Sequence, residues 1–136
     1  MKGLVVDCSV TAVWLLEDED DRVAIAALEA VDTTPISVPA LWIYEVMNVL
    51  VVAERRKRLK AKKFNVLLEE LAEIPIAIEH DVDPNRVIEI ARRQKLSAYD
   101  AAYVELAQRK SYELCTLDQG MKKAARAEGV SLFEPA

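Results

Sequence analysis

The sequence predicts an α/β protein in which a parallel β-sheet is covered by helices on both faces. Short apolar runs alternate along the chain with longer segments of helical periodicity, which is the pattern of successive β-α units. The first run, "GLVVD" at residues 3–7, is rich in valine and suits a strand buried on both faces. No linker, repeat or low-complexity segment divides the 136 residues, so we expect one domain spanning residues 1–136.

The first half of the chain supplies two strands and four helices. Ser9 is a plausible cap for the first helix, and Pro39 is well placed to open the third. The third helix is apolar nearly all round until its basic end. In order, the elements are a strand at 3–7, helices at 9–17 and 21–31, a strand at 35–39, and helices at 39–58 and 61–73.

The second half continues the alternation. Gly129 is expected to close the last helix because glycine readily adopts the backbone conformation that ends helices. The expected elements are a strand at 75–80, helices at 85–95 and 95–110, a strand at 112–118, a helix at 119–129 and a short last strand at 130–134.

Composition narrows the class of protein. Hydrophobic residues make up 52% and charged residues 30%, which is typical of a globular chain. No apolar run approaches the roughly 20 residues of a membrane helix, and "MKGLVVD" reaches an aspartate too early for a secretory signal. Cys8 and Cys115 have no metal-ligand spacing, and His80 is the only histidine. We therefore expect a cytoplasmic protein whose two thiols are reduced, buried and inert rather than redox-active.

The charges are unevenly distributed. The net charge of −5 argues against a protein that coats nucleic acid nonspecifically. A basic stretch at 54–63 and an acidic stretch at 17–22 are most simply solvated segments, and the alternative role of the basic stretch, or of Lys122, Lys123 and Arg126, is to steer a polyanion.

Four acidic residues are expected at one edge of the sheet. Asp7 closes the first strand, and Asp118 follows the strand that contains "ELCT". Glu45 lies in the second turn of a helix that directly follows a strand. Asp100 begins a helix that leads back into the "ELCT" strand. Ligands of parallel sheets bind at the edge formed by the C-terminal ends of the strands, so these acids are candidates for one site.

Structural roles compete with a catalytic one at each position. Ser97 and Asp100 fit a capping box, which accounts for Asp100 on its own. Glu45 and Asn48 are the only polar residues in "PALWIYEVMNVLVVA", and they share a helical face. Asn48 either orients Glu45 by a hydrogen bond or satisfies a nearby backbone group. A buried glutamate is costly unless its oxygens meet a cation or reach a cleft.

The chemistry of gathered carboxylates favours a divalent cation. Two such charges about 4 Å apart repel by about 4 kcal/mol at an effective dielectric constant near 20. Oxygen ligands without cysteine or histidine suit Mg²⁺ or Mn²⁺ rather than zinc. Such an ion binds phosphate oxygens and acidifies water, so the pattern predicts hydrolysis of phosphodiester bonds.

The motifs "VVDCS", "YEVMNVL", "SAYDAAYVELA" and "TLD" resemble, in order and spacing, the four acidic motifs of PIN-domain ribonucleases. The likeness is strongest to the VapC toxins of toxin–antitoxin pairs. It implies a three-layer α/β/α sandwich around a short, mainly parallel sheet. It also implies that Asp7, Glu45, Asp100 and Asp118 hold one or two Mg²⁺ or Mn²⁺ ions and position the attacking water.

The same resemblance implies a substrate and partners. The substrate would be RNA of the tRNA or ribosomal RNA class, and the chain would be a homodimer inhibited by an antitoxin protein. Ser9 and Thr116 stand where the family commonly has hydroxyl residues beside the acids, with helix capping or a structural hydrogen bond as the alternative role. Trp14, Leu15 and Trp42 would either contact the antitoxin or pack in the core, and core packing is the simpler role.

Other functions fit the sequence less well. A catalytically weak PIN-like module that acts mainly by binding a protein partner is the main alternative. A phosphatase of the haloacid dehalogenase type would need an aspartate where Ser9 stands. A receiver domain would need adjacent acids near the first strand and a lysine near the last, and the sequence has neither.

Overall fold

The structure is a computed structural model that describes residues 2–135 and contains a four-stranded sheet. Its strands run in the order β3-β2-β1-β4, and each adjacent pair is parallel, with Leu4 opposite both Ile36 and Glu113. The α/β class expected from the sequence is therefore confirmed. The strands are β1 (Leu4–Val6), β2 (Ile36–Pro39), β3 (Ile76–Glu79) and β4 (Glu113–Cys115).

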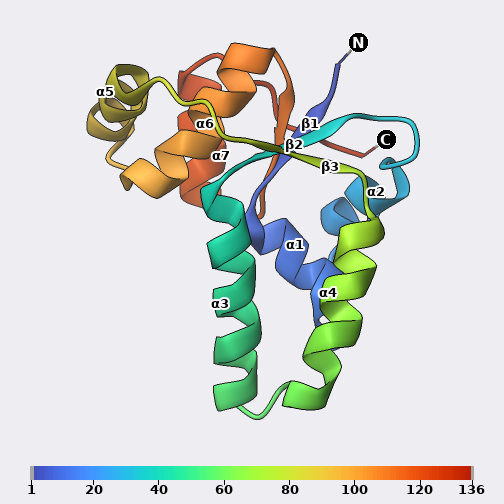
Figure 1. The fold of residues 1–136 in the computed structure, drawn as a ribbon. Coiled ribbons are helices and arrows are strands. Elements are labelled where there is room, and N and C mark those ends of the chain that lie inside the picture. Colours follow the sequence, from blue (N-terminus) through green and yellow to red (C-terminus); the bar gives the residue numbers. More distant parts are fainter. Residues whose placement is uncertain (1, 136) are drawn as a thin grey trace.

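Helices cover both faces of this sheet, as Figure 1 shows, which confirms the expected three-layer arrangement. One side carries α5, α6 and α7, and α6 packs directly against β1, β2 and β4. The other side carries α1 and α2, while α3 and α4 form a hairpin that projects away from the sheet. The helices are α1 (Cys8–Leu15), α2 (Arg22–Glu29), α3 (Leu41–Arg55), α4 (Phe64–Glu73), α5 (Pro84–Gln94), α6 (Ala98–Lys110) and α7 (Gln119–Ala127), with a 3₁₀ turn at Ala61–Lys63.

The strand order has a consequence for ligand binding. The chain proceeds from β1 to β2 and β3 on one side, and β4 then adds to the opposite side of β1. The strand order therefore reverses between β1 and β4, and the helices that follow these two strands, α1 and α7, lie on opposite sides of the sheet. In parallel sheets such a switch point is where ligands bind.

Three sequence expectations need correction. The strand expected at 130–134 is only a bridge between Leu114 and Leu132, because β4 is three residues long and pairs with the tail at one position. Pro39 ends β2 instead of opening α3, since it stays extended opposite Glu79 in the β2–β3 ladder. The cap of α1 is Asp7 rather than Ser9. Gly129, with φ of 77°, ends the last helix as expected.

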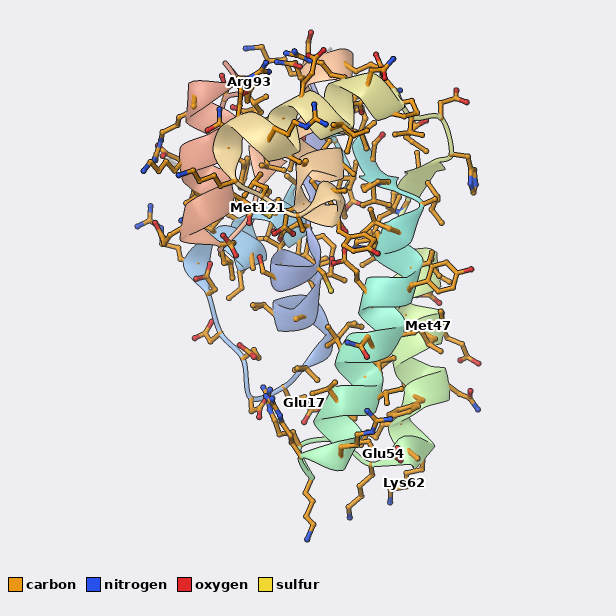
Figure 2. All side chains as sticks on the ribbon, turned by 90° about the vertical axis from the view of Figure 1, so that its left-hand side faces the viewer. Glu17, Met47, Glu54, Lys62, Arg93 and Met121 are labelled. Atoms are coloured by element: carbon orange, nitrogen blue, oxygen red, sulfur yellow. The ribbon has the colours of Figure 1, made fainter. Side chains whose placement is uncertain are left out.

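The two charged stretches of the sequence meet. Arg58 donates from Nε and Nη2 to the carboxylate of Asp18 at 2.9 and 2.8 Å, and Nη2 also lies 2.9 Å from Glu19. These groups are exposed, so the contact contributes little stability. Figure 2 shows Glu17, Glu54 and Lys62 at the same end of the molecule. The end of α3 is about 15 Å along the helix from Glu45, so the basic stretch lies away from the switch point.

The tryptophans and Leu15 have structural roles. Trp42 and Leu15 are buried in the core, and half-buried Trp14 donates its indole N–H to the carbonyl of Ala24 at 2.7 Å. These contacts show that the three residues pack in the core, which is the simpler of the two roles expected from the sequence. None of the helices formed by residues 2–135 is long and apolar enough to cross a membrane.

One buried hydrogen-bond chain ties α3 to the start of α1. Trp42 donates its indole N–H to Thr11 Oγ1 at 2.9 Å, and that hydroxyl donates to the backbone carbonyl of Asp7 at 3.1 Å. Thr11 is fully buried. The chain fixes the distance between the helix that carries Glu45 and the residue that ends β1.

Replacing Thr11 by valine tests this link. The change keeps the shape but leaves the Trp42 N–H without a partner, which is expected to lower the free energy of unfolding by about 1–3 kcal/mol. Thr33→Val, at an exposed turn, is the control and is expected to change it by less than about 0.5 kcal/mol. Urea denaturation measures both. Equal effects of the two substitutions would contradict a structural role for the Thr11 hydroxyl.

Candidate active site

Asp7 is a buried carboxylate at the point where β1 ends and α1 begins. Its side chain is 4% exposed. Asp7 Oδ1 accepts hydrogen bonds from Ser9 Oγ at 2.6 Å and from the Val10 N–H at 3.2 Å, and Oδ2 accepts one from the Thr116 hydroxyl. Burial raises the pKa of Asp7 above its usual value, these three hydrogen bonds oppose the shift, and the charge of Asp118 adds to it.

The two hydroxyl residues join the loops that follow β1 and β4. Ser9 Oγ accepts from the Leu117 N–H at 3.0 Å, and Thr116 Oγ1 accepts from the Asp118 N–H at 3.1 Å. Each hydroxyl therefore donates to Asp7 and accepts from a backbone N–H of the loop after β4. Ser9 and Thr116 thus hold the two sides of the switch point together. Asp118 is exposed and caps α7 by accepting from the Met121 N–H at 2.9 Å.

Glu45 faces Tyr103 of α6. The Tyr103 hydroxyl donates to Glu45 Oε1 at 2.5 Å. Burial raises the pKa of Glu45, the Tyr103 hydrogen bond lowers it, and the charges of Asp100 and Asp7 raise it further. Burial also raises the pKa of Tyr103, so the phenol remains a donor. Asn48 is exposed and, among the described residues, makes no hydrogen bond to Glu45, so Tyr103 is what orients this carboxylate.

Asp100 lies in the first turn of α6, where only half of the expected capping box forms. Ser97 Oγ accepts from the Asp100 N–H at 3.1 Å. Within residues 2–135, the Asp100 carboxylate takes part in no hydrogen bond, so capping leaves both of its oxygens available. Burial raises its pKa, and the charge of Asp118 raises it further.

The structure brings all four predicted acids into electrostatic contact at the C-terminal edge of the sheet. Asp7 interacts with Asp118 and Glu45, and Asp100 interacts with Glu45 and Asp118. All of these interactions are repulsive. The pKa values of Asp7, Glu45 and Asp100 are raised in part by these neighbouring charges, and carboxylates that repel one another in this way are suited to binding a cation.

The donor set fits a hard divalent ion in kind. It consists of carboxylate and hydroxyl oxygens, which suit Mg²⁺ or Mn²⁺. Across residues 2–135, no group of three or more His, Cys, Asp or Glu side chains stands close enough to hold one metal ion as placed. The neighbouring thiols of Cys8 and Cys115 do not belong to this donor set. Burial raises the pKa of each to about 12, so both stay protonated at neutral pH.

Tyr103 is the residue that the sequence analysis missed. It stands three residues after Asp100 on α6, which places both side chains on the same side of the helix. The sequence contained a signal for Tyr103, because the three-residue spacing of Asp100 and Tyr103 in "YDAAY" indicates a shared helix face. The partner of Tyr103 could not be found in this way, because Glu45 is 58 positions away in the sequence.

Residues 4–127 match the family model described as PIN domain. The chain therefore belongs to the PIN domain family, and the resemblance found in its acidic motifs is confirmed. Within that family it is similar to Ribonuclease VapC3 of two Mycobacterium tuberculosis strains. The identity is 31% over 121 residues, which cover 89% of this chain and 86% of the relative.

Solved structures agree on the fold. PAE2754 from Pyrobaculum aerophilum superposes with a TM-score of 0.71 over 92% of this chain and 81% of its own. FitAcB from Neisseria gonorrhoeae gives a TM-score of 0.64, covering 96% of each chain. A structure of FitAB bound to an IR36 DNA fragment gives 0.69, covering 96% of this chain and 93% of that one. Each is 20% identical in sequence, so these likenesses concern the fold alone.

The hydrogen bond from Tyr103 can be tested by Tyr103→Phe. Because the phenol favours the ionised form of Glu45, its removal is expected to raise the Glu45 pKa above that of the wild type. Side-chain ¹³C NMR of the carboxyl groups measures the titration. Tyr99→Phe is the control, since Tyr99 is 68% exposed. A Glu45 pKa that stays the same or falls in Tyr103→Phe would show that the phenol does not hold this carboxylate.

The repulsion among the acids predicts a pH dependence of stability. The pKa values of Asp7, Glu45 and Asp100 are raised in the folded state. The folded state therefore binds more protons than the unfolded chain, and the free energy of unfolding should fall as the pH rises from about 4 through the raised values.

Asp100→Asn removes one of the repelling charges. In metal-free buffer with a chelator, this variant is expected to melt at a higher temperature than the wild type at pH 7.5, with a smaller difference at pH 4. Asp32→Asn, at an exposed turn, is the matched control and should leave the melting temperature unchanged at both pH values. A lower melting temperature of Asp100→Asn at pH 7.5 would contradict the repulsion.

Proposed function

We propose that this protein is a Mg²⁺- or Mn²⁺-dependent endoribonuclease and the toxin of a toxin–antitoxin pair, acting in the cytoplasm on RNA of the tRNA or ribosomal RNA class. The name of its relative, Ribonuclease VapC3, supports the substrate. The observation that carries the proposal is the convergence of carboxylates from four separate segments at the β1/β4 switch point.

The four acids have different roles in this proposal. Asp7, Glu45, Asp100 and Asp118 would hold the cation, which when bound supplies Lewis-acid stabilisation of phosphate charge and lowers the pKa of water. Asp7 is fixed by Ser9 and Thr116, and Glu45 by Tyr103. The Asp100 carboxylate forms no hydrogen bond within residues 2–135. Asp100 would therefore be the acid that accepts a proton from the attacking water. Exposed Asn48, one turn from Glu45, is available to contact RNA.

Partners are proposed on the same basis. The VapC3 relationship supports an antitoxin protein that inhibits the site, and a homodimer is expected. Exposed apolar side chains stand on α3 and α4 and would suit protein contacts; they are Tyr44, Met47, Val66 and Leu68, of which Figure 2 labels Met47.

The same apolar side chains favour the second candidate function, a catalytically weak PIN-like module that acts through a protein partner. Titration of the metal-free protein with Mn²⁺ by calorimetry separates the two. A nuclease of the proposed kind should take up Mn²⁺ in a saturable manner that weakens as the pH falls, because protonation neutralises the ligands. No saturable uptake at pH 7.5 would favour the binding module.

The cleavage assay uses Asp100→Asn, which keeps the shape of the side chain and disturbs no hydrogen bond of the carboxylate. The variant is expected to cleave total RNA in Mg²⁺ at least about 100-fold more slowly than the wild type, because removing a group that acts in the transition state typically costs about 10²–10⁴-fold. Asp32→Asn is the control and should cleave at the wild-type rate. Cleavage by Asp100→Asn at the wild-type rate would refute the proposed site.

A further inference from the structure

A cavity lies on the outer side of β4. Its volume is about 350 Å³, within the usual range for small-molecule sites. The start of α2, the exposed side of α7 and the tail at 132–135 form its walls. The apolar part is made by Leu114, Leu132 and Phe133, and the charged part includes Arg22, Lys122 and Arg126.

The cationic side chains of this cavity form few ion pairs within the described residues. Within residues 2–135, neither Arg22 nor Lys122 forms an ion pair, and Arg126 has only a 4.0 Å contact with Glu134. Two acidic residues, Asp21 and Glu134, also line the cavity. Asp21 Oδ1 accepts from the N–H groups of Val23 and Ala24 at 2.8 and 3.1 Å, and Glu134 is exposed. The lining therefore carries three cationic side chains against two carboxylates in a protein whose net charge is −5, and an excess of cations in a cavity attracts an anion.

Thr116 connects the cavity to the candidate active site. It lines the cavity, and its hydroxyl donates to Asp7. Lys122 belongs to the helix that Asp118 caps. An RNA strand with one phosphodiester bond at the carboxylates would therefore have a neighbouring nucleotide within reach of the cavity.

We propose that this cavity binds one nucleotide of the RNA substrate beside the scissile bond. Arg22 and Lys122 bind its phosphate, and the base packs against Phe133. Aromatic side chains stack on bases without regard to sequence, and arginine and lysine contact phosphates. The assignment of the occupant rests on the proposed function, because it takes the carboxylate site to be the place where RNA is cut.

Nucleotide binding can be measured without cleavage. The full chain, ¹⁵N-labelled and metal-free, is titrated with adenosine 5′-monophosphate, adenosine and inorganic phosphate. We expect the monophosphate to bind tighter than either fragment, with shifts at the amides of residues 114–126 and 131–134. Arg22→Ala/Lys122→Ala should weaken the monophosphate about tenfold or more, since charge-assisted bonds to phosphate are lost. Phe133→Leu, which keeps an apolar side chain, should weaken adenosine but not phosphate.

Two controls keep this test separate from that of the proposed function. Lys62→Ala/Lys63→Ala removes the same number of charges from the exposed end of the α3–α4 hairpin and should leave nucleotide binding unchanged. Asp100→Asn should abolish cleavage and still bind the monophosphate. If Asp100→Asn cleaves normally, the proposed function fails, whereas loss of only the nucleotide result overturns only this inference.

The cleavage kinetics add a second readout. With a single-stranded oligoribonucleotide, Arg22→Ala/Lys122→Ala should raise KM about tenfold with little change in kcat, because binding is lost and the carboxylates are untouched. Monophosphate binding that is absent in the wild type, or unaffected by the double substitution, would overturn the proposal. Binding of poly-glutamate as tightly as the oligoribonucleotide would also overturn the proposal. The cavity would then recognise negative charge alone and would bind an acidic peptide equally well.

Discussion

Burial of the Asp7 carboxylate between β1 and β4 is the constraint on which the rest of the site depends. A carboxylate that is 4% exposed keeps its place only if hydrogen bonds reach both oxygens. Ser9 and Thr116 provide them, and each uses its remaining capacity on the backbone of the loop after β4. The position of one charge therefore fixes the two loops between which a ligand can enter.

The rest of the fold provides a rigid frame for this arrangement. β1 is at most 1% exposed along its length, and α6 lies across three strands with Tyr103 buried at its centre. On the other side, Thr11 and Trp42 tie α1 to α3. The frame holds like charges near one another at a cost in stability, and a bound cation would offset that cost. Stability given up at a site in exchange for function is common among enzymes.

The sequence predicted the α/β class and the common edge of the acids, because the alternation of apolar runs and amphipathic segments reports layer order directly. It did not predict the contacts that depend on distant residues. Tyr103 meets Glu45 across 58 positions, and Arg58 meets Asp18 across 40. Local chemistry also misled at Ser9, since a serine is a good cap but Asp7, two residues earlier, already accepts the Val10 N–H. The sequence could not distinguish a last strand from an isolated bridge. Residues 130–134 have the composition of a strand, but β4 is too short to pair with them at more than one position.

The position of β3 at the end of the sheet leaves one row of backbone groups without a partner strand in the part of the chain described, whereas the free side of β4 is bonded by the tail at Ser131 and Phe133. Such margins can recruit strands from other molecules and begin aggregation. β3 offers only four residues, Pro75 directly precedes it, and its last residue, Glu79, is held by Lys110 at 3.0 Å. Short length, a preceding proline and charge are the usual safeguards of exposed strands, so β3 is a poor template for fibril growth.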